Sequence, residues 1–126
     1  MPSALTSHKD LKVWREAVVL AADTYKLTAR FPKEEQYGIA AQMRRASVSI
    51  GSNIAEGAAR QGPREFIQFL YFASGSASEL YTQLEIAKCL YPARELELLE
   101  VQGAVENVSR MLHGLIRGVR ARSRAP

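Results

Sequence analysis

The sequence predicts an all-α protein folded as an up-down-up-down antiparallel four-helix bundle. Apolar residues recur at alternating three- and four-residue steps in four separate segments, the spacing that keeps one stripe of a helix against a neighbour. No strand-like alternation of apolar and polar residues competes with this pattern. Helix-ending residues separate the segments at Pro32, Gly57, Gly62-Pro63 and Pro92. Short connections between helices of similar length favour a bundle of antiparallel neighbours.

The first two predicted helices lie before Gly57. The first starts after Ser7, an N-cap with Asp10 three residues on, and ends near Phe31-Pro32. Its predicted stripe is Leu11, Trp14, Val18, Ala21, Tyr25 and Thr28. The second follows Glu34 and Glu35, whose charge suits the positive end of a helix. Its predicted stripe is Ile39, Met43, Ala46, Ile50 and Ile54.

The third and fourth predicted helices occupy the second half of the chain. Gly62 and Pro63 suit the cap and the first position of the third helix, and Pro92 ends it. Its predicted stripe is Phe66, Leu70, Ala73, Ala77, Leu80, Leu84 and Ala87. The fourth begins among glutamates near Glu95, and its predicted stripe is Leu98, Val101, Val105, Val108, Leu112, Leu115 and Val119. We therefore expect one bundle domain over residues 1–116, followed by a frayed basic tail over residues 117–126.

Charge comes in blocks along the 126 residues, which carry a formal net charge of +4. Residues 1–64 and 117–126 each have four more basic than acidic side chains, and residues 65–116 have four more acidic ones. Such blocks indicate a binding surface rather than a uniformly basic protein. A single cysteine and two histidines give no metal-binding spacing, so we expect no cofactor and no metal. The absence of a signal peptide and of a long apolar run predicts a cytoplasmic protein with no membrane partner.

A polar stripe crosses the second helix. Within a sector of about 80° on a helical wheel, apolar residues flank Gln42, Arg45, Ser49, Asn53 and Glu56 on both sides. A polar row between apolar rows implies burial, and the third helix offers partners in Ser76, Glu79 and Gln83. We expect an Arg45–Glu79 charge pair, with Ser49 and Asn53 hydrogen-bonded nearby. The stripe is either a structural network that fixes helix register, which we favour, or a ligand or subunit contact.

A second apolar strip on the same helix favours self-association. It consists of Ala41, Val48 and Ala55 and exceeds what one bundle core requires.

Five strings of residues resemble one bacterial family in order and spacing. They are Lys9-Asp10-Leu11-Lys12-Val13-Trp14, Phe31-Pro32, Gln42-Met43-Arg44-Arg45-Ala46, Ser49-Ile50-Gly51-Ser52-Asn53-Ile54-Ala55-Glu56-Gly57 and Gly75-Ser76-Ala77-Ser78-Glu79-Leu80. The chain is similar over residues 8–116 to the four-helix-bundle family of the ribosomal RNA intervening-sequence protein and the accessory variability protein of diversity-generating retroelements.

The resemblance implies a helical protomer that assembles into a homopentamer and has no known enzymatic activity. Retroelement members bind nucleic acid and partner a reverse transcriptase, so both are expected partners if this chain is retroelement-linked. The positions that match the family motif are Gln42, Arg45, Ser49, Asn53, Glu56, Gly57, Ser76 and Glu79. In the family, that motif relates to fold and assembly more clearly than to a catalytic site.

We expect a non-enzymatic oligomeric accessory protein that binds RNA or DNA through basic surface, without sequence specificity. Candidate contacts are Arg15, Lys26, Arg30, Lys33, Arg44, Arg60, Arg64, Arg117, Arg120, Arg122 and Arg124, with solvated surface charge as the alternative for each. The alternative function is a homopentameric scaffold that binds a protein and no nucleic acid. Catalysis is the weakest hypothesis, because the motifs of common nucleophilic and metal enzymes are absent. His113 is expected to be a packing residue, and Cys89 is expected to be a core residue.

Overall fold

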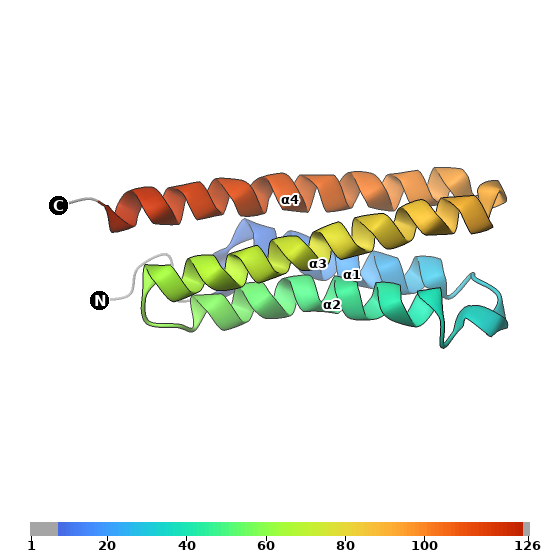
Figure 1. The fold of residues 1–126 in the computed structure, drawn as a ribbon, viewed down its shortest axis with the longest axis horizontal. Helices are drawn as coiled ribbons and strands as arrows, with labels where there is room; N and C mark the ends of the chain where they lie inside the picture. Colours follow the sequence, from blue (N-terminus) through green and yellow to red (C-terminus); the bar gives the residue numbers. More distant parts are fainter. Residues whose placement is uncertain (1–7, 125–126) are drawn as a thin grey trace.

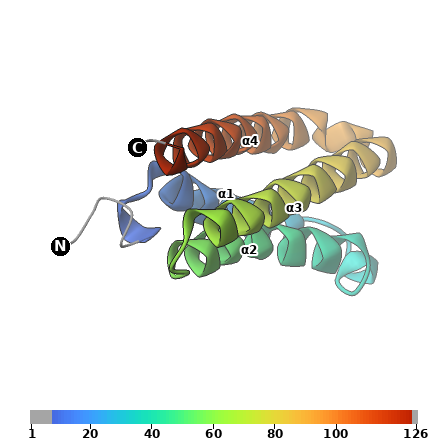
Figure 2. The ribbon, with the colours of Figure 1, turned by 60° about the vertical axis from the view of Figure 1, so that its left-hand side comes forward.

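The computed structural model describes residues 8–124, which form an antiparallel four-helix bundle. Its helices are α1 (Lys12–Thr28), α2 (Ile39–Ala58), α3 (Pro63–Leu90) and α4 (Glu95–Ser123). Each helix packs on the next in sequence, and α4 returns to pack on α1 (Figures 1 and 2). The predicted fold class is therefore confirmed.

The stripes predicted for α2, α3 and α4 form most of the core. Every residue of the α3 stripe is buried, as are those of α2 except the half-buried Ile39. On α4, Ile116 is buried in place of the half-buried Leu115. Burial of such aliphatic side chains is the main stabilising term of a bundle without disulfides.

The stripe predicted for α1 is mostly wrong, although its Leu11 and Trp14 are half-buried and pack against the core. The fully buried side chains of α1 are Val13, Ala17, Leu20, Thr24, Leu27 and Thr28, and Thr28 is the one residue the prediction shares with them. Val18 and Tyr25 are each 46% exposed. Apolar residues cover two neighbouring sides of α1, and periodicity alone does not distinguish the side that faces the core from the side that does not.

The helix boundaries correct two further predictions. Short 3-10 turns, η1 (His8–Asp10) and η2 (Lys33–Glu35), precede α1 and α2. Glu34 and Glu35 thus lie in η2, and the first turn of α2 contains no acidic residue. The Ser7 cap lies outside the described residues. The fourth helix continues through Ser123 with Val119 buried, so residues 117–123 are helical rather than frayed.

The two connections at the α1 C-terminal end of the bundle touch through Phe31 and Tyr91, whose ring centres are 4.9 Å apart. Burial raises the pKa of the Tyr91 phenol, and the carboxylate of Glu35 raises it further. Because this pKa is raised in the folded protein, the contribution of Tyr91 to stability is complete below the ordinary pKa of about 10. It is lost as the pH rises through the pKa of the folded state.

We expect Tyr91→Phe to lessen the loss of stability at alkaline pH. Urea midpoints of both proteins across that range test this, and identical alkaline declines would contradict it.

Candidate nucleic-acid interface

One end of the bundle gathers basic side chains from three distant parts of the chain. Residues 8–16, 56–65 and 117–124 meet there because α1 and α3 begin at the end where α2 and α4 finish (Figure 1). These segments contain nine Lys and Arg residues and four Asp and Glu residues. We call this surface the basic end and define it by its cations, Lys9, Lys12, Arg15, Arg60, Arg64, Arg117, Arg120, Arg122 and Arg124.

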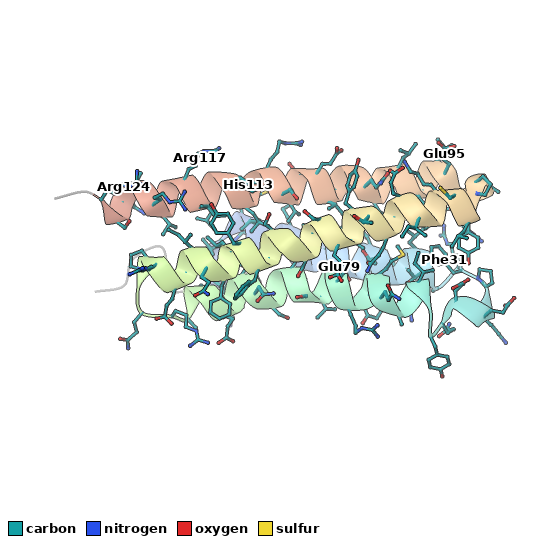
Figure 3. The ribbon with its side chains drawn as sticks, in the orientation of Figure 1. Phe31, Glu79, Glu95, His113, Arg117 and Arg124 are labelled. Carbon is teal, nitrogen blue, oxygen red and sulfur yellow. The ribbon has the colours of Figure 1, made fainter. Side chains whose placement is uncertain are left out.

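The opposite end has the reverse balance. Residues 23–38 and 83–100 contain seven Asp and Glu residues and five Lys and Arg residues. Figure 3 shows Arg117 and Arg124 toward one end of α4 and Glu95 at the other. The two ends of the bundle therefore differ in charge, and the basic end is the one with an excess of positive side chains.

Some arginines of the basic end are held in place by neighbours. Arg15 donates to the Lys9 carbonyl at 3.0 Å, and Arg120 donates to the Tyr71 hydroxyl at 3.3 Å. Arg60 forms an ion pair with Glu56 at 2.8 Å and lies 4.9 Å from the centre of the Phe69 ring. These contacts restrict side-chain freedom and leave the guanidinium groups at the surface.

The remaining arginines of the basic end point into solvent. The side chains of Arg64, Arg117, Arg122 and Arg124 are exposed and make no ion pair or hydrogen bond with another described residue. Unpaired guanidinium groups are suited to phosphate oxygens, because no internal carboxylate has to be displaced. This cluster makes the basic end a candidate surface for binding anions.

Four predicted nucleic-acid contacts lie elsewhere. Lys26, Arg30 and Lys33 are at the opposite end, where Arg30 pairs with Glu97. Arg44 is on the side shared by α1 and α2, where its Nε donates to Thr28 Oγ1 at 2.8 Å and its guanidinium lies 5.0 Å from the centre of the Tyr25 ring. The structure thus excludes these four from the cluster.

Sequence reasoning also missed Lys9 and Lys12, which belong to the basic end. The predicted topology already indicated their position, because an even number of antiparallel helices returns the chain to the end of the bundle where it started. The first and last helices therefore contribute to one surface.

The polar stripe of α2 is partly confirmed. Asn53 Nδ2 donates to Ser49 Oγ at 3.0 Å, and Ser76 Oγ donates to Ser49 Oγ at 2.9 Å, which links α2 to α3. The predicted burial is wrong for Gln42, Arg45 and Glu56, which are exposed. No ion pair joins Arg45 to Glu79 among the four ion pairs of the described residues. Instead, the side chains of Arg45 and Glu79 line a groove of about 400 Å³ between α2 and α3.

Paired substitutions separate the structural part of the stripe from its exposed part. We expect Asn53→Ala to lower the unfolding free energy by about 0.5–1.5 kcal/mol, because it removes half-buried hydrogen bonds. We expect Arg45→Ala to change it by less than about 0.5 kcal/mol. Urea unfolding of both variants measures these changes in unfolding free energy. A larger loss for Arg45→Ala than for Asn53→Ala would contradict the exposed position of Arg45.

Cys89 is exposed, so the prediction that it is a core residue is wrong. His113 is also exposed, and its Nε2 lies 3.5 Å from Ser74 Oγ. Within residues 8–124, no group of three His, Cys, Asp or Glu side chains could hold a metal ion. No described helix is long and apolar enough to cross a membrane.

Fold and surface together define a helical-bundle protein with one basic end. The model of the 23S rRNA-intervening sequence protein family matches residues 9–114. The chain belongs to this family. It is similar to the crystal structure of a protein of unknown function from the S23 ribosomal protein family of Bacteroides thetaiotaomicron, with a TM-score of 0.76 and 21% identity. That match covers 82% of this chain and 97% of the other, and it supports the fold alone. No curated protein matches the chain significantly.

Proposed function

We propose that this protein is a non-enzymatic, oligomeric accessory protein of the cytoplasm that binds nucleic acid at its basic end. The observation that carries the proposal is the convergence of three basic segments on one end of the bundle. Basic groups at this surface interact favourably with a phosphate backbone and release its counterions. Membership of a family associated with a ribosomal RNA insert is in keeping with such a partner.

The proposed binding lacks sequence specificity. The basic end consists of helix ends and short turns, and its cations come from three separate segments of the chain. Arginines at such a surface contact phosphates and fix orientation, while the base sequence has little effect. A homopentamer, the assembly that the family resemblance implies, would multiply these contacts on one polyanion and raise avidity.

The test is a binding titration of the intact protein with labelled single-stranded and duplex oligonucleotides of unrelated sequences. We expect similar affinities for all sequences and a loss of about a hundredfold or more between about 50 and 200 mM salt. Undetectable binding, or binding insensitive to salt, would contradict the proposal.

A scaffold that binds a protein partner is the second candidate function. It is favoured by the exposed apolar side chains between α1 and α2, which include Val18, Tyr25 and Val48. A reverse transcriptase would be such a partner if the gene lies in a retroelement. Pull-down of that enzyme by the intact oligomer, with no oligonucleotide binding, would favour this alternative.

A further inference from the structure

The groove between α2 and α3, with a volume of about 400 Å³, is lined almost entirely by polar side chains. Apart from Ala46, its lining residues are Gln42, Arg45, Ser49, Glu79 and Gln83. None of them belongs to the segments that form the basic end. Polar groups that converge on one hollow fix the orientation of a small ligand, so this groove is a candidate binding site.

One side chain of the groove is buried without a hydrogen-bond partner for its oxygen. Gln83 is 6% exposed, and its Oε1 accepts no hydrogen bond from any described residue. By contrast, the amide of Gln102, also buried, donates to Glu85 Oε1 at 2.8 Å. Buried polar atoms in proteins almost always have a partner, so an unpaired oxygen in the wall of a groove marks a place for a donor. Because Gln83 lines the groove, a ligand there can supply that donor.

Two opposite charges line the same groove without pairing with each other. Arg45 and Glu79 are exposed, and neither belongs to any of the four ion pairs of the described residues. Glu79 lies where α3 borders α2 (Figure 3). The Ser76–Ser49 hydrogen bond sets the register of the two helices and places Glu79 level with the residue after Arg45. A ligand with a carboxylate and an ammonium group on neighbouring atoms can therefore pair with both side chains at once.

The amide side chains of the groove lie a short way along the axis from these charges. In the same register, Gln83 is level with Gln42, and it is four residues, or about 6 Å, from Glu79. A carboxamide can donate to Gln83 Oε1 and accept from the amide of Gln42, because it carries both kinds of group. In free glutamine, an ethylene spacer joins the charged head to such a carboxamide, which suits this separation.

The other end of the groove offers a ligand less. Ser49 Oγ already accepts hydrogen bonds from Asn53 Nδ2 at 3.0 Å and from Ser76 Oγ at 2.9 Å. A hydroxyl oxygen has two lone pairs, so both are used within the chain. The side chain of a bound ligand is therefore directed toward Gln42 and Gln83.

We propose that the groove between α2 and α3 binds a free α-amino acid with an amide side chain, of which glutamine has the best-matched length. Its carboxylate pairs with Arg45, its ammonium group pairs with Glu79, and its carboxamide donates to Gln83 Oε1. A peptide lacks the adjacent pair of opposite charges, because its internal amine and carboxyl groups are joined in uncharged amides. This site is separate from the basic end and adds a small-molecule ligand to the proposed function.

Calorimetric titration of the intact protein with free glutamine tests the site. We expect saturable binding of one ligand per chain. Norvaline has a methyl group in place of the carboxamide, and glutaramate lacks the amine. Both should bind about tenfold more weakly or worse, since each leaves a polar group of the site unpaired. No saturable binding of glutamine, or equal affinity for either analogue, would overturn the proposal.

Neutral substitutions test the two charged groups. We expect Arg45→Gln and Glu79→Gln each to weaken glutamine binding by about tenfold or more, because each removes a charge-assisted hydrogen bond. Both side chains are exposed, so the melting temperatures should stay close to that of the wild type. Arg110→Gln and Glu106→Gln are matched controls on α4, exposed and outside the four ion pairs of the described residues. Unchanged binding in the groove variants, or equal losses in the controls, would overturn the assignment.

Gln83→Leu separates recognition of the amide from packing. Leucine fills a similar space without a polar atom, so the variant should keep or raise the melting temperature. We expect it to lose the preference for glutamine over norvaline. A folded variant that retained this preference would overturn the role of Gln83.

The amino-acid site and the basic end can be tested separately. We expect Arg45→Gln to keep salt-dependent oligonucleotide binding within a few-fold of the wild type, because Arg45 is outside the basic end. A wild-type protein that bound oligonucleotides and no glutamine would overturn this inference alone. One that bound glutamine and no oligonucleotide would instead overturn the proposed nucleic-acid binding.

Discussion

Gly57→Ala is expected to destabilise the bundle by about 1–3 kcal/mol, the usual cost of forcing extra volume into a packed contact. Gly57 is buried near the end of α2, where α3 passes closely. A Cβ added there would lie 2.7 Å from Phe69 Cβ, 3.1 Å from Phe66 Cδ1 and 3.3 Å from the Phe66 carbonyl oxygen. Two of these atoms are fixed to the backbone of α3, so the helices would have to separate.

A glycine elsewhere provides the matched control. Within a helix, alanine is normally more stable than glycine by about 0.5–1 kcal/mol, so intrinsic propensity opposes the effect expected at Gly57. Gly103 is exposed in α4, and a Cβ added to it meets nothing within 4 Å. We expect Gly103→Ala to stabilise the protein. Urea unfolding free energies of the two variants should therefore change in opposite directions, and equal stability of Gly57→Ala and wild type would refute the close contact.

Neutralising the arginines of α4 is expected to cost most of the nucleic-acid affinity. The variant replaces Arg117, Arg120, Arg122 and Arg124 with glutamine, which retains a good helix propensity. If each arginine binds a phosphate, the slope of log affinity against log salt should shrink by about one for each arginine that is replaced. We expect affinity to fall by about a hundredfold or more at low salt.

Substitution is a better test here than deletion of residues 117–126. Val119 is buried and the helix continues to Ser123, so a truncated chain would lose packing together with charge. The glutamine variant keeps that packing, and its melting temperature should stay close to that of the wild type.

The control removes the same number of charges from the other end. Its substitutions, all to glutamine, are at Lys26, Arg30, Lys33 and Arg94. We expect its affinity to change only a few-fold, because long-range attraction is screened beyond roughly 10 Å at 0.1 M salt. Equal weakening by the two sets would mean that net charge alone drives binding, and no weakening by either would place the nucleic acid on another surface.

Most of the fold was predictable because core periodicity is a local property of the sequence. The buried stripes of α2, α3 and α4 follow directly from apolar spacing, and Pro63 and Pro92 indicate where helices begin and end. The stripe of α1 was not predictable in the same way. Apolar residues lie on two of its sides, and only packing against the other helices selects the buried one.

The polar stripe shows a similar division. Spacing correctly placed Ser49, Asn53 and Ser76 in one hydrogen-bonded group across α2 and α3. The prediction that Arg45 is buried and paired with Glu79 was wrong, because side-chain pairing depends on positions in three dimensions. Both side chains line a surface groove between α2 and α3, and Arg45 is exposed.

By itself, the sequence determined that the chain forms four amphipathic helices, roughly where the turns fall, and that its excess of positive charge is in residues 1–64 and 117–126. Only the tertiary structure decided which charges act together. Antiparallel packing brings Arg15, Arg60 and Arg117 to one end of the bundle and takes Lys26 and Arg44 away from it. The reason is physical, since helix formation depends on neighbours along the chain, whereas an electrostatic surface depends on distances in space.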